Sequence, residues 1–334
     1  MLRIGLVGVG YLGGRHLNHL STLEGVQVSA IWDTSAFALL NAANAYKVPV
    51  ANDLADLISK SDALVVVSPT TSHFEIGMEV INAGKPLFIE KPICATGVEG
   101  RALVESAEAK GVPIQVGHIE RFNRAFRTLK NLDIHPRFVE IHRLAQWNPR
   151  GGDVAVVHDL MIHDLDLLLT LAGCSPSHIH ASGVGVISTS IDIANARLEF
   201  PTGLVANVTA SRISLKKMRK VRLFGEHEYI ALDLNKGTCE YVGAEMGTST
   251  TQFGAPLPGV EILGEMEMGP RRMRLFRNFI EAPEGDAMRL ELSAFRDAVI
   301  DGTPPLVSGR NGLEALEVAE AILLKIKEGH HGST

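Results

Sequence analysis

The amino-acid sequence predicts an α/β protein with two parts. These are a doubly wound parallel sheet at the N-terminus and a C-terminal α+β domain with an open, mainly antiparallel sheet. Over roughly the first 120 residues, short β-branched runs alternate with helical patterns, as in chains that build a parallel sheet. From residue 137 the runs become period-two, which is typical of antiparallel strands. We therefore expect two domains, residues 1–120 and residues 121–334.

The N-terminal elements are expected in regular alternation. Apolar runs predict buried strands at residues 3–10, 26–33, 62–69, 86–92 and 113–118. Helical patterns predict helices in the intervals, at residues 13–23, 35–46, 73–83 and 97–110. Strand, helix, strand order of this kind is how a chain forms parallel neighbours, because each return to the sheet needs a crossover.

The C-terminal elements follow a different pattern. Period-two or β-rich runs predict strands at residues 137–144, 194–200, 204–211, 220–226 and 228–234. One strong helix is expected at residues 153–172, and two more, at about 287–301 and 310–328, end the chain. We interpret the Gly-rich, Met-bearing stretch at 236–270 as a mobile loop or an excursion of the chain.

Composition excludes several classes of function. Hydrophobic residues make up 46% of the 334 residues, but no segment approaches the roughly 20 apolar residues of a membrane span. The sequence begins directly with structure, so we expect a cytoplasmic protein with no membrane partner. The three cysteines lie far apart and predict neither disulfides nor a metal site. A net charge of −6 argues against nucleic acid, and we interpret the basic run at 215–222 as the solvated face of a strand.

Four glycines occur within seven positions after the first expected strand. Gly8, Gly10 and Gly13 form the pattern G-x-G-x-x-G at the start of a helix, which is the setting of a dinucleotide-binding Rossmann domain. Gly8 would permit the tight turn, Gly10 the approach of a pyrophosphate, and Gly13 the close packing of helix on strand. The helix N-terminus would then direct its N–H groups at the anion.

Asp33 strengthens this interpretation. It ends the second expected strand, where a carboxylate can accept hydrogen bonds from the ribose hydroxyls of the cofactor and repel a 2′-phosphate. No arginine adjoins it to favour the phosphorylated cofactor. We therefore expect NAD rather than NADP, the alternative being that Asp33 only caps the next helix.

Glu90 and Lys91 follow the fourth expected strand, in the segment FIEKP. Ligands of open α/β sheets bind beyond the carboxyl ends of the strands, so both side chains are expected near the nicotinamide end of the site. Taken alone, such a Glu-Lys pair is usually a solvated strand end.

The segment at 156–169, VVHDLMIHDLDLLL, concentrates acidic and histidine side chains. On a helix Asp159, His163 and Asp166 would share one face, and a carboxylate one turn from a histidine is a common arrangement for a general base. A helix surface with satisfied hydrogen bonds is the plain alternative. A metal site is a weaker one, because the surrounding sequence is rich in strands.

Together these segments resemble the family of glucose-fructose oxidoreductases and inositol dehydrogenases. The resemblance rests on GVGYLGGRH at 8–16, SPTTSH at 68–73, GKP at 84–86, EKP at 90–92 and the Asp159-x-x-x-His163 pair. The late DGTPPLVSGRNGLEALEVAEAI is also similar to the family, so that the resemblance covers essentially the whole length. It implies an NAD(P)-dependent oxidoreductase of CH–OH groups with an N-terminal Rossmann domain.

The resemblance also implies roles for individual residues. His163 would take the hydroxyl proton as general base, Lys91 would stabilise the charge that develops on the same oxygen, and Asp159 would complete the network. The residues expected to bind the cofactor are Gly8, Gly10, Tyr11, Leu12, Gly13, Asp33, Ser68, Pro69, Thr70, His73, Glu90 and Lys91. No metal ion is implied.

The segment VGHIERFNRAF at 116–126 is most similar to the subgroup that oxidises the 3-hydroxyl of UDP-N-acetylglucosamine. In that case Arg121, Asn123 and Arg212 would contact the sugar or its diphosphate, beside Lys91, Asp159 and His163. The sequence departs from the subgroup at Arg124, where proline is more usual, and the plain alternative places Arg121 and Arg124 on an exposed helix start.

Two other functions fit the same residues. One is a dehydrogenase of inositol or another free monosaccharide, which would need no contact with a diphosphate. The other is a non-catalytic regulator that binds NAD, although such relatives would be expected to lose the lysine or the histidine, and both are present. The resemblance further implies a homodimer or a homotetramer.

Overall fold

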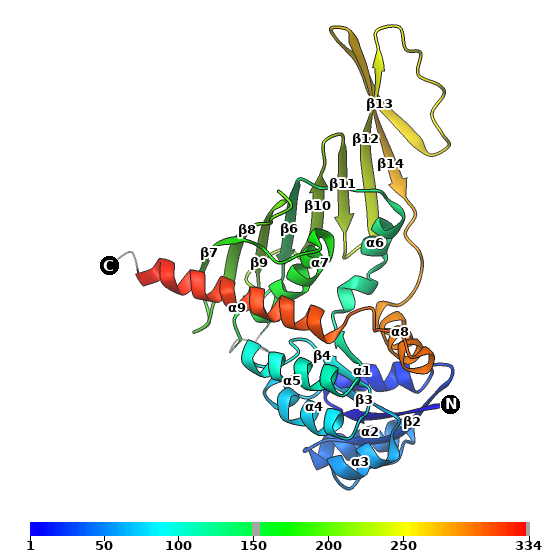
Figure 1. Ribbon diagram of the computed structural model, residues 1–334, viewed down its shortest axis with the longest axis vertical. Helices are drawn as coiled ribbons and strands as arrows, with labels where there is room; N and C mark the ends of the chain where they lie inside the picture. Colours follow the sequence, from blue (N-terminus) through cyan, green and yellow to red (C-terminus); the bar gives the residue numbers. More distant parts are fainter. Residues whose placement is uncertain (149–153, 332–334) are drawn as a thin grey trace. The chain divides into compact units, whose positions relative to one another are not determined.

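The computed structural model describes residues 1–148 and 154–331, and the chain divides into two compact units (Figure 1). The first comprises Met1–Ile119 and Gly285–Glu320, and the second comprises Glu120–Glu284 and the chain from Ala321 onward. The assignment of 1–120 and 121–334 as functional domains stays a prediction. Among the described residues, no helix is long and apolar enough to cross a membrane.

The first unit is built on a five-stranded sheet with the order β2-β1-β3-β4-β5 and parallel neighbours throughout. Its strands are β1 (Leu2–Val7), β2 (Val26–Trp32), β3 (Ala63–Val66), β4 (Leu87–Glu90) and β5 (Ile114–Gly117). Every residue of β3, β4 and β5 is buried. This confirms the doubly wound parallel sheet, whose strands read as continuous apolar runs because helices cover both faces.

Several helices of the first unit begin at a residue whose side chain caps the helix. The helices of this unit are α1 (Tyr11–Leu20), α2 (Ala36–Tyr46), α3 (Leu54–Lys60), η1 (Thr70–Ser72), α4 (His73–Asn82), α5 (Gly97–Ala109), α8 (Ala287–Asp301) and the first part of α9 (Gly309–His331). Those that begin at a capping side chain are α2, α3, α5 and α8. Thr96 and Glu99 form a capping box at the start of α5. Helix α8 joins this core through Phe295, whose ring lies 5.8 Å from that of Phe88 in β4.

The second unit is built on a nine-stranded sheet with the order β13-β14-β12-β11-β10-β6-β9-β8-β7. The strands are β6 (Phe138–Leu144), β7 (His178–Val184), β8 (Ile193–Glu199), β9 (Val205–Ser211), β10 (Met218–Phe224), β11 (Glu228–Asp233), β12 (Thr238–Thr248), β13 (Val260–Met268) and β14 (Arg271–Ile280). Neighbours are antiparallel except β6 and β9, which run parallel. The mainly antiparallel sheet is therefore confirmed.

Short helices and one longer helix accompany this sheet. They are η2 (Ile119–Phe122), α6 (Arg124–Arg127), η3 (Thr128–Asn131), η4 (Val157–Met161) and α7 (Ile162–Ala172). Element η4 is a turn of π-helix that continues directly into α7. The expected helix at 153–172 is thus α-helical only from Ile162, and Asp153 lies outside the described residues.

The stretch at 236–270 is where the sequence-based expectation was wrong. It contains β12 and β13, which pair with β14 as an extension of the sheet (Figure 1). Strand β13 alternates between half-buried and exposed residues and has no fully buried position. Without a buried face, a strand shows little of the apolar alternation by which it is recognised. The glycines were therefore the main signal in this stretch, and they indicated a loop.

Candidate active site

The turn from β1 into α1, residues 8–13, is shaped by glycine at two positions. Gly8 has φ +85°, and a Cβ there would lie 2.7 Å from the carbonyl oxygen of Val67. A Cβ on Gly13 would lie 2.0 Å from the carbonyl oxygen of Gly8, so the helix meets the strand more closely than any side chain allows. At Gly10 a Cβ would meet nothing within 4 Å, which leaves the backbone at the start of α1 open to a ligand.

Asp33 holds this turn in place from the end of β2. One carboxylate oxygen accepts the N–H of Val9 at 2.8 Å, and the other accepts the N–H of Ser35 at 2.7 Å. A carboxylate has about four lone-pair positions, so two acceptor positions are still available for the hydroxyls of a ribose. The side chain can therefore orient the turn and contact a nucleotide at the same time.

A cavity of about 990 Å³ lies at the carboxyl ends of β1, β2 and β3, and we call it the nucleotide cavity. The expected cofactor residues in its wall are Gly8, Gly10, Tyr11, Leu12, Gly13, Asp33, Ser68 and Pro69. Thr70, His73, Glu90 and Lys91 are not among its lining residues. Asp53, Thr71 and Glu75 line it and were not anticipated, because each belongs to a helix start that carries no motif of its own.

His73, Glu90 and Lys91 lie beside the strand ends. The His73 ring nitrogens lie 2.9 Å from the carbonyl oxygens of Ser68 and Pro92, so the imidazole joins the loops after β3 and β4. Burial lowers the pKa of His73 in spite of these carbonyls. Glu90 is buried against His16 of α1, at 2.8 Å, and its other oxygen accepts the N–H of Lys91 at 3.1 Å. Lys91 itself is half-buried.

Asp159 and His163 belong to the second unit, on η4 and α7 respectively, whereas Lys91 belongs to the first. A π-helical turn carries more residues per turn than an α-helix and is frequent at functional sites. Both side chains are half-buried, and Asp159 lines a cavity of about 380 Å³ that we call the Asp159 cavity. Asp166, which was expected on the same face, is fully buried and lies away from that cavity.

Buried ion pairs join β6 to η2 and α7. Arg143 of β6 donates to both oxygens of Asp164, at 2.7 and 2.8 Å, and to Glu120 at 2.9 Å. Burial acts to lower the pKa of Arg143, but the carboxylates of Asp164 and Glu120 outweigh it and raise the pKa above its ordinary value. Burial acts to raise the pKa of Asp164, yet we assign it as ionised because both of its oxygens accept hydrogen bonds from Arg143. We call Glu120, Arg143 and Asp164 the Arg143 cluster.

The three residues expected to contact the sugar or its diphosphate beside the catalytic residues are Arg121, Asn123 and Arg212, and all have partners within the second unit. Arg121 donates to both oxygens of Asp166, at 2.6 and 2.8 Å, and its side chain is only 10% exposed. Asn123 caps α6 and donates to Glu120 at 3.0 Å and to the carbonyl of Leu234 at 2.9 Å. Their roles in substrate binding stay predictions, and Arg121 already neutralises a buried carboxylate.

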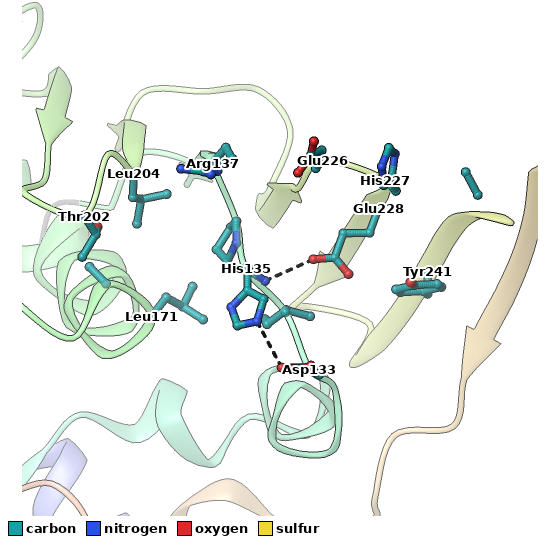
Figure 2. Close-up of a pocket in the computed structure, with 14 residues that line it drawn as sticks. Asp133, His135, Arg137, Leu171, Thr202, Leu204, Glu226, His227, Glu228 and Tyr241 are labelled. Carbon is teal, nitrogen blue, oxygen red and sulfur yellow. Dashed lines mark hydrogen bonds and ion pairs between the residues drawn. The ribbon is translucent and has the colours of Figure 1, made fainter. Parts of the chain in front are cut away.

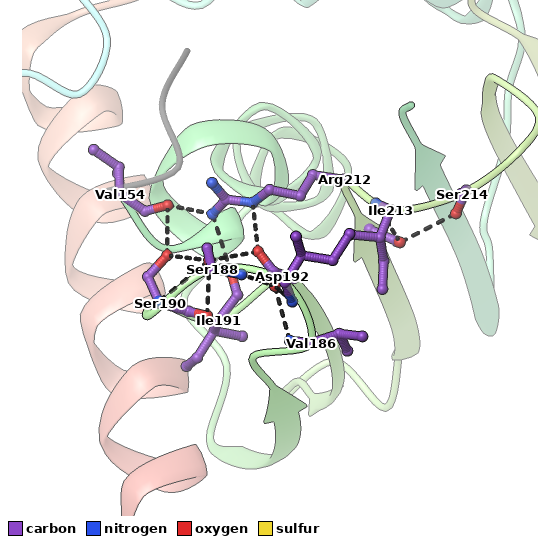
Figure 3. Close-up of polar contacts among 11 residues, drawn as sticks. Val154, Val186, Ser188, Ser190, Ile191, Asp192, Arg212, Ile213 and Ser214 are labelled. Carbon is purple, nitrogen blue, oxygen red and sulfur yellow. Dashed lines mark hydrogen bonds and ion pairs between the residues drawn. The ribbon is translucent and has the colours of Figure 1, made fainter. Parts of the chain in front are cut away.

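Arg212 is the third of these residues, and Figure 3 shows its contacts. It donates to the carbonyls of Val154 and Ile191, and its Nε lies 3.5 Å from Asp192. Burial acts to raise the pKa of Asp192. The hydroxyl of Ser188 and the N–H groups of residues 186–188 outweigh burial and hold the pKa below its ordinary value. Arg212 thus ties the chain just before η4 to the end of β9.

Figure 2 shows another cavity of the second unit, of about 670 Å³. His135 lies between two carboxylates there: its N–H donates to Glu228 at 3.2 Å, and its ring lies 3.3 Å from Asp133. None of the residues expected at the active site lines this cavity. Within residues 1–148 and 154–331, no group of three or more His, Cys, Asp or Glu side chains is arranged to hold a metal ion.

A glycine turn with a nucleotide cavity, joined in one chain to a unit with an open sheet, is the arrangement expected of an oxidoreductase that uses a dinucleotide. Residues 2–118 match the family described as "Oxidoreductase family, NAD-binding Rossmann fold", and residues 127–231 match the GFO/IDH/MocA C-terminal domain. The chain belongs to the GFO/IDH/MocA family of oxidoreductases.

Full-length relatives share this fold. UDP-N-acetylglucosamine 3-dehydrogenase of Acidithiobacillus ferrooxidans is 28% identical over 327 residues, which cover 98% of this chain and 97% of that protein. A solved structure of that enzyme has a TM-score of 0.85 at 27% identity and covers 98% of each chain. An inositol 2-dehydrogenase of Cereibacter sphaeroides is 29% identical over 333 residues, covering 96% of this chain and 92% of the relative.

Proposed function

We propose that the protein is an NAD-dependent dehydrogenase that oxidises a secondary hydroxyl of a nucleotide sugar to a ketone, namely the 3-hydroxyl of UDP-N-acetylglucosamine. The observation that carries the proposal is the similarity to a UDP-N-acetylglucosamine 3-dehydrogenase through both units, over 98% of the chain. Similarity confined to the first unit would support only the use of a dinucleotide, since that fold serves many substrates.

The preference for NAD rests on Asp33. A 2′-phosphate beside this carboxylate would place like charges together, whereas ribose hydroxyls can donate to its remaining lone pairs.

The fit of the nucleotide is tested by Gly10→Ala, because the added methyl group meets no protein atom and reaches only the space of the ligand. We expect NADH affinity to fall at least about tenfold, measured by fluorescence titration, with an unchanged Tm. A matched Gly14→Ala variant, also without clash, should keep the NADH affinity and should not lower Tm.

The reaction assigns a separate task to each candidate side chain. The imidazole of His163 takes the proton of the sugar hydroxyl, the ammonium of Lys91 donates a hydrogen bond to the same oxygen, and Asp159 orients the sugar. When bound, NAD would accept the hydride from the carbon that carries this hydroxyl. A general base of this kind contributes about 10²–10⁴ in rate, so His163→Ala should lower kcat by that order.

The direct test is the absorbance of NADH at 340 nm with purified protein, NAD and UDP-N-acetylglucosamine, beside free N-acetylglucosamine and a panel of inositols. Parallel reactions contain 2-oxoglutarate, which would oxidise a tightly held NADH back to NAD and itself be reduced to 2-hydroxyglutarate. Because NADH does not accumulate in that set, it is followed by the ketone and 2-hydroxyglutarate formed. Oxidation of the nucleotide sugar and of no other substrate, abolished in His163→Ala, is the expected result. Neither NADH in the first set nor ketone in the second would contradict the proposal.

The second candidate is a dehydrogenase of inositol or a free monosaccharide, which the 29% identity to an inositol 2-dehydrogenase favours. In that case the same assay yields NADH with a polyol and none with the nucleotide sugar.

A homodimer or homotetramer is proposed for either substrate, and light scattering in solution distinguishes these states from a monomer.

A further inference from the structure

The basic run at 215–222 is divided by the structure into two sides. In β10, Val221 and Leu223 are buried and alternate with half-buried residues. Arg219 has the same parity as these buried residues, so it lies on their side of the strand, at an exposed position. Its side chain is exposed, as expected for a solvated strand face, but it shares that face with the buried residues.

Arg219 and Lys217 line the Asp159 cavity. The amide side chains of Gln146, Asn148 and Asn235 line the same cavity. Its volume of about 380 Å³ lies within the range of small-molecule sites. The wall thus combines a carboxylate, which accepts from sugar hydroxyls, with cations and amides, which donate to phosphate oxygens.

The charges of these cations are compensated to different degrees. Arg212, which also lines the cavity, pairs with Asp192. Arg219 lies 3.2 Å from Glu120, but this carboxylate also accepts from Arg143, and the Arg219 side chain is 48% exposed. Lys217 is exposed, and within the described parts of the chain its ammonium has no hydrogen-bond or ion-pair partner. Lys217 and Arg219 therefore have donors to spare for an anion.

We propose that the Asp159 cavity is the binding site for the diphosphate of a nucleoside diphosphate sugar, with Lys217 and Arg219 as its ligands. The proposal rests on the proposed function, because it needs the sugar of the same ligand to lie toward Asp159. An arginine fork and a lysine ammonium are the usual partners of phosphate oxygens. The anionic part of the substrate is thereby assigned to residues other than Arg121 and Arg212, whose guanidinium groups pair with buried carboxylates.

The binding test uses UDP and calorimetry, with saturating NAD present so that the nucleotide cavity is occupied. Lys217→Ala should weaken UDP binding at least about tenfold, the scale of one charge-assisted contact. It should also reduce the salt dependence of binding. Lys216→Ala is the matched control, since this exposed neighbour does not line the cavity. Pyrophosphate should compete with UDP, and uridine should not.

Because Lys217 has no hydrogen-bond or ion-pair partner to lose among residues 1–148 and 154–331, its variant should fold as the wild type does. Arg219→Lys, which keeps a charge beside Glu120, extends the test and should weaken UDP binding less than Lys217→Ala. Equal UDP affinity of Lys217→Ala and Lys216→Ala would overturn the proposal. Absence of UDP binding to the wild type, or competition by uridine but not by pyrophosphate, would do the same.

Turnover separates this proposal from the proposed function. NADH formation from UDP-N-acetylglucosamine with the same KM in wild type and Lys217→Ala would leave the proposed function standing and remove the diphosphate site. UDP binding that depends on Lys217, without oxidation of any nucleotide sugar, would support the diphosphate site and contradict the proposed function. If both hold, Lys217→Ala raises KM for the nucleotide sugar and leaves kcat largely unchanged.

Discussion

The glycine turn of the first unit and the Arg143 cluster of the second prepare a site in opposite ways. In the turn, the backbone itself faces the cavity, and what matters is the absence of side-chain atoms at Gly8, Gly10 and Gly13. In the cluster, three ionisable side chains are buried together, and Arg143 is only 2% exposed. A substitution in the glycine turn is costly because the new side chain has no room. A substitution in the Arg143 cluster is costly because it leaves a charge buried without its partner.

The largest effect is expected where the charge cluster is broken. Arg143→Met keeps the volume of the side chain but leaves Asp164 and Glu120 buried beside a neutral group. Loss of one partner of a buried ion pair costs about 3–5 kcal/mol in the free energy of unfolding. Thermal and urea unfolding followed by circular dichroism measure it.

Arg222→Met is the matched control for that experiment. This arginine lies on the same strand and pairs with Glu140 at 3.2 Å, with both side chains 32% exposed. An exposed pair of this kind contributes about 0–1 kcal/mol. Equal losses of unfolding free energy in Arg143→Met and Arg222→Met would show that the burial of the charge does not determine the cost of removing the arginine.

A smaller effect is expected from the glycine turn. In Gly13→Ala the new methyl group would lie 2.0 Å from the carbonyl oxygen of Gly8, so α1 must move away from β1. Overpacking of this kind costs about 1–3 kcal/mol, and NADH binding should be lost with it. Gly14→Ala, in the same helix, meets no atom within 4 Å and should be neutral or stabilising by up to about 1 kcal/mol. If the backbone contact is the cause, Gly13→Ala lowers Tm and abolishes NADH binding, whereas Gly14→Ala does not lower Tm and keeps the NADH affinity.

The smallest effect concerns an exposed ion pair of the first unit. Hydrogen bonds from the side chain and backbone of Arg3 hold the pKa of Asp62 at about 2, below its ordinary 3.8. Since the folded pKa is the lower one, Asp62 stabilises the fold above about pH 4, and this contribution is lost as the pH falls toward 2. The carboxylate is 37% exposed, so the effect should stay below about 1 kcal/mol.

The measurement is the free energy of unfolding between pH 5 and pH 2.5 in the wild type and in Asp62→Asn. The wild type should lose more stability than the variant over this interval. A steeper loss in the variant would mean that Asp62 does not titrate with a lowered pKa.

The same contrast explains how much could be predicted from sequence. The parallel sheet and the glycine turn are encoded locally, in apolar runs and in three glycines within six positions. The pairing of Arg121 with Asp166 joins residues 45 positions apart, and no pattern near either residue indicates it. The sequence therefore indicated substrate contact for Arg121, while its place in the fold depends on a buried carboxylate further along the chain.

Two further differences have physical causes of the same kind. The apolar spacing at 156–169 predicted one regular helix, but spacing alone does not distinguish an α-turn from the π-turn of η4. Strands β12 and β13 escaped notice because they lie toward the edge of the sheet, where several side chains on both faces stay exposed. Lys217 and Arg219 are exposed, as the basic run predicted, but nothing in the sequence indicated that both line the Asp159 cavity.

The parallel pairing of β6 with β9 determines when the second unit can close during synthesis. Phe138 of β6 pairs with Val205 on one side and with Phe224 on the other, so neither neighbour exists until much more chain has emerged. Arg143, by contrast, finds Glu120 and Asp164 only 23 and 21 positions away. Closing a loop costs more entropy as it lengthens, and folding slows as contacts become more distant in sequence. We therefore expect the charges of this strand to meet their partners before the strand meets its sheet.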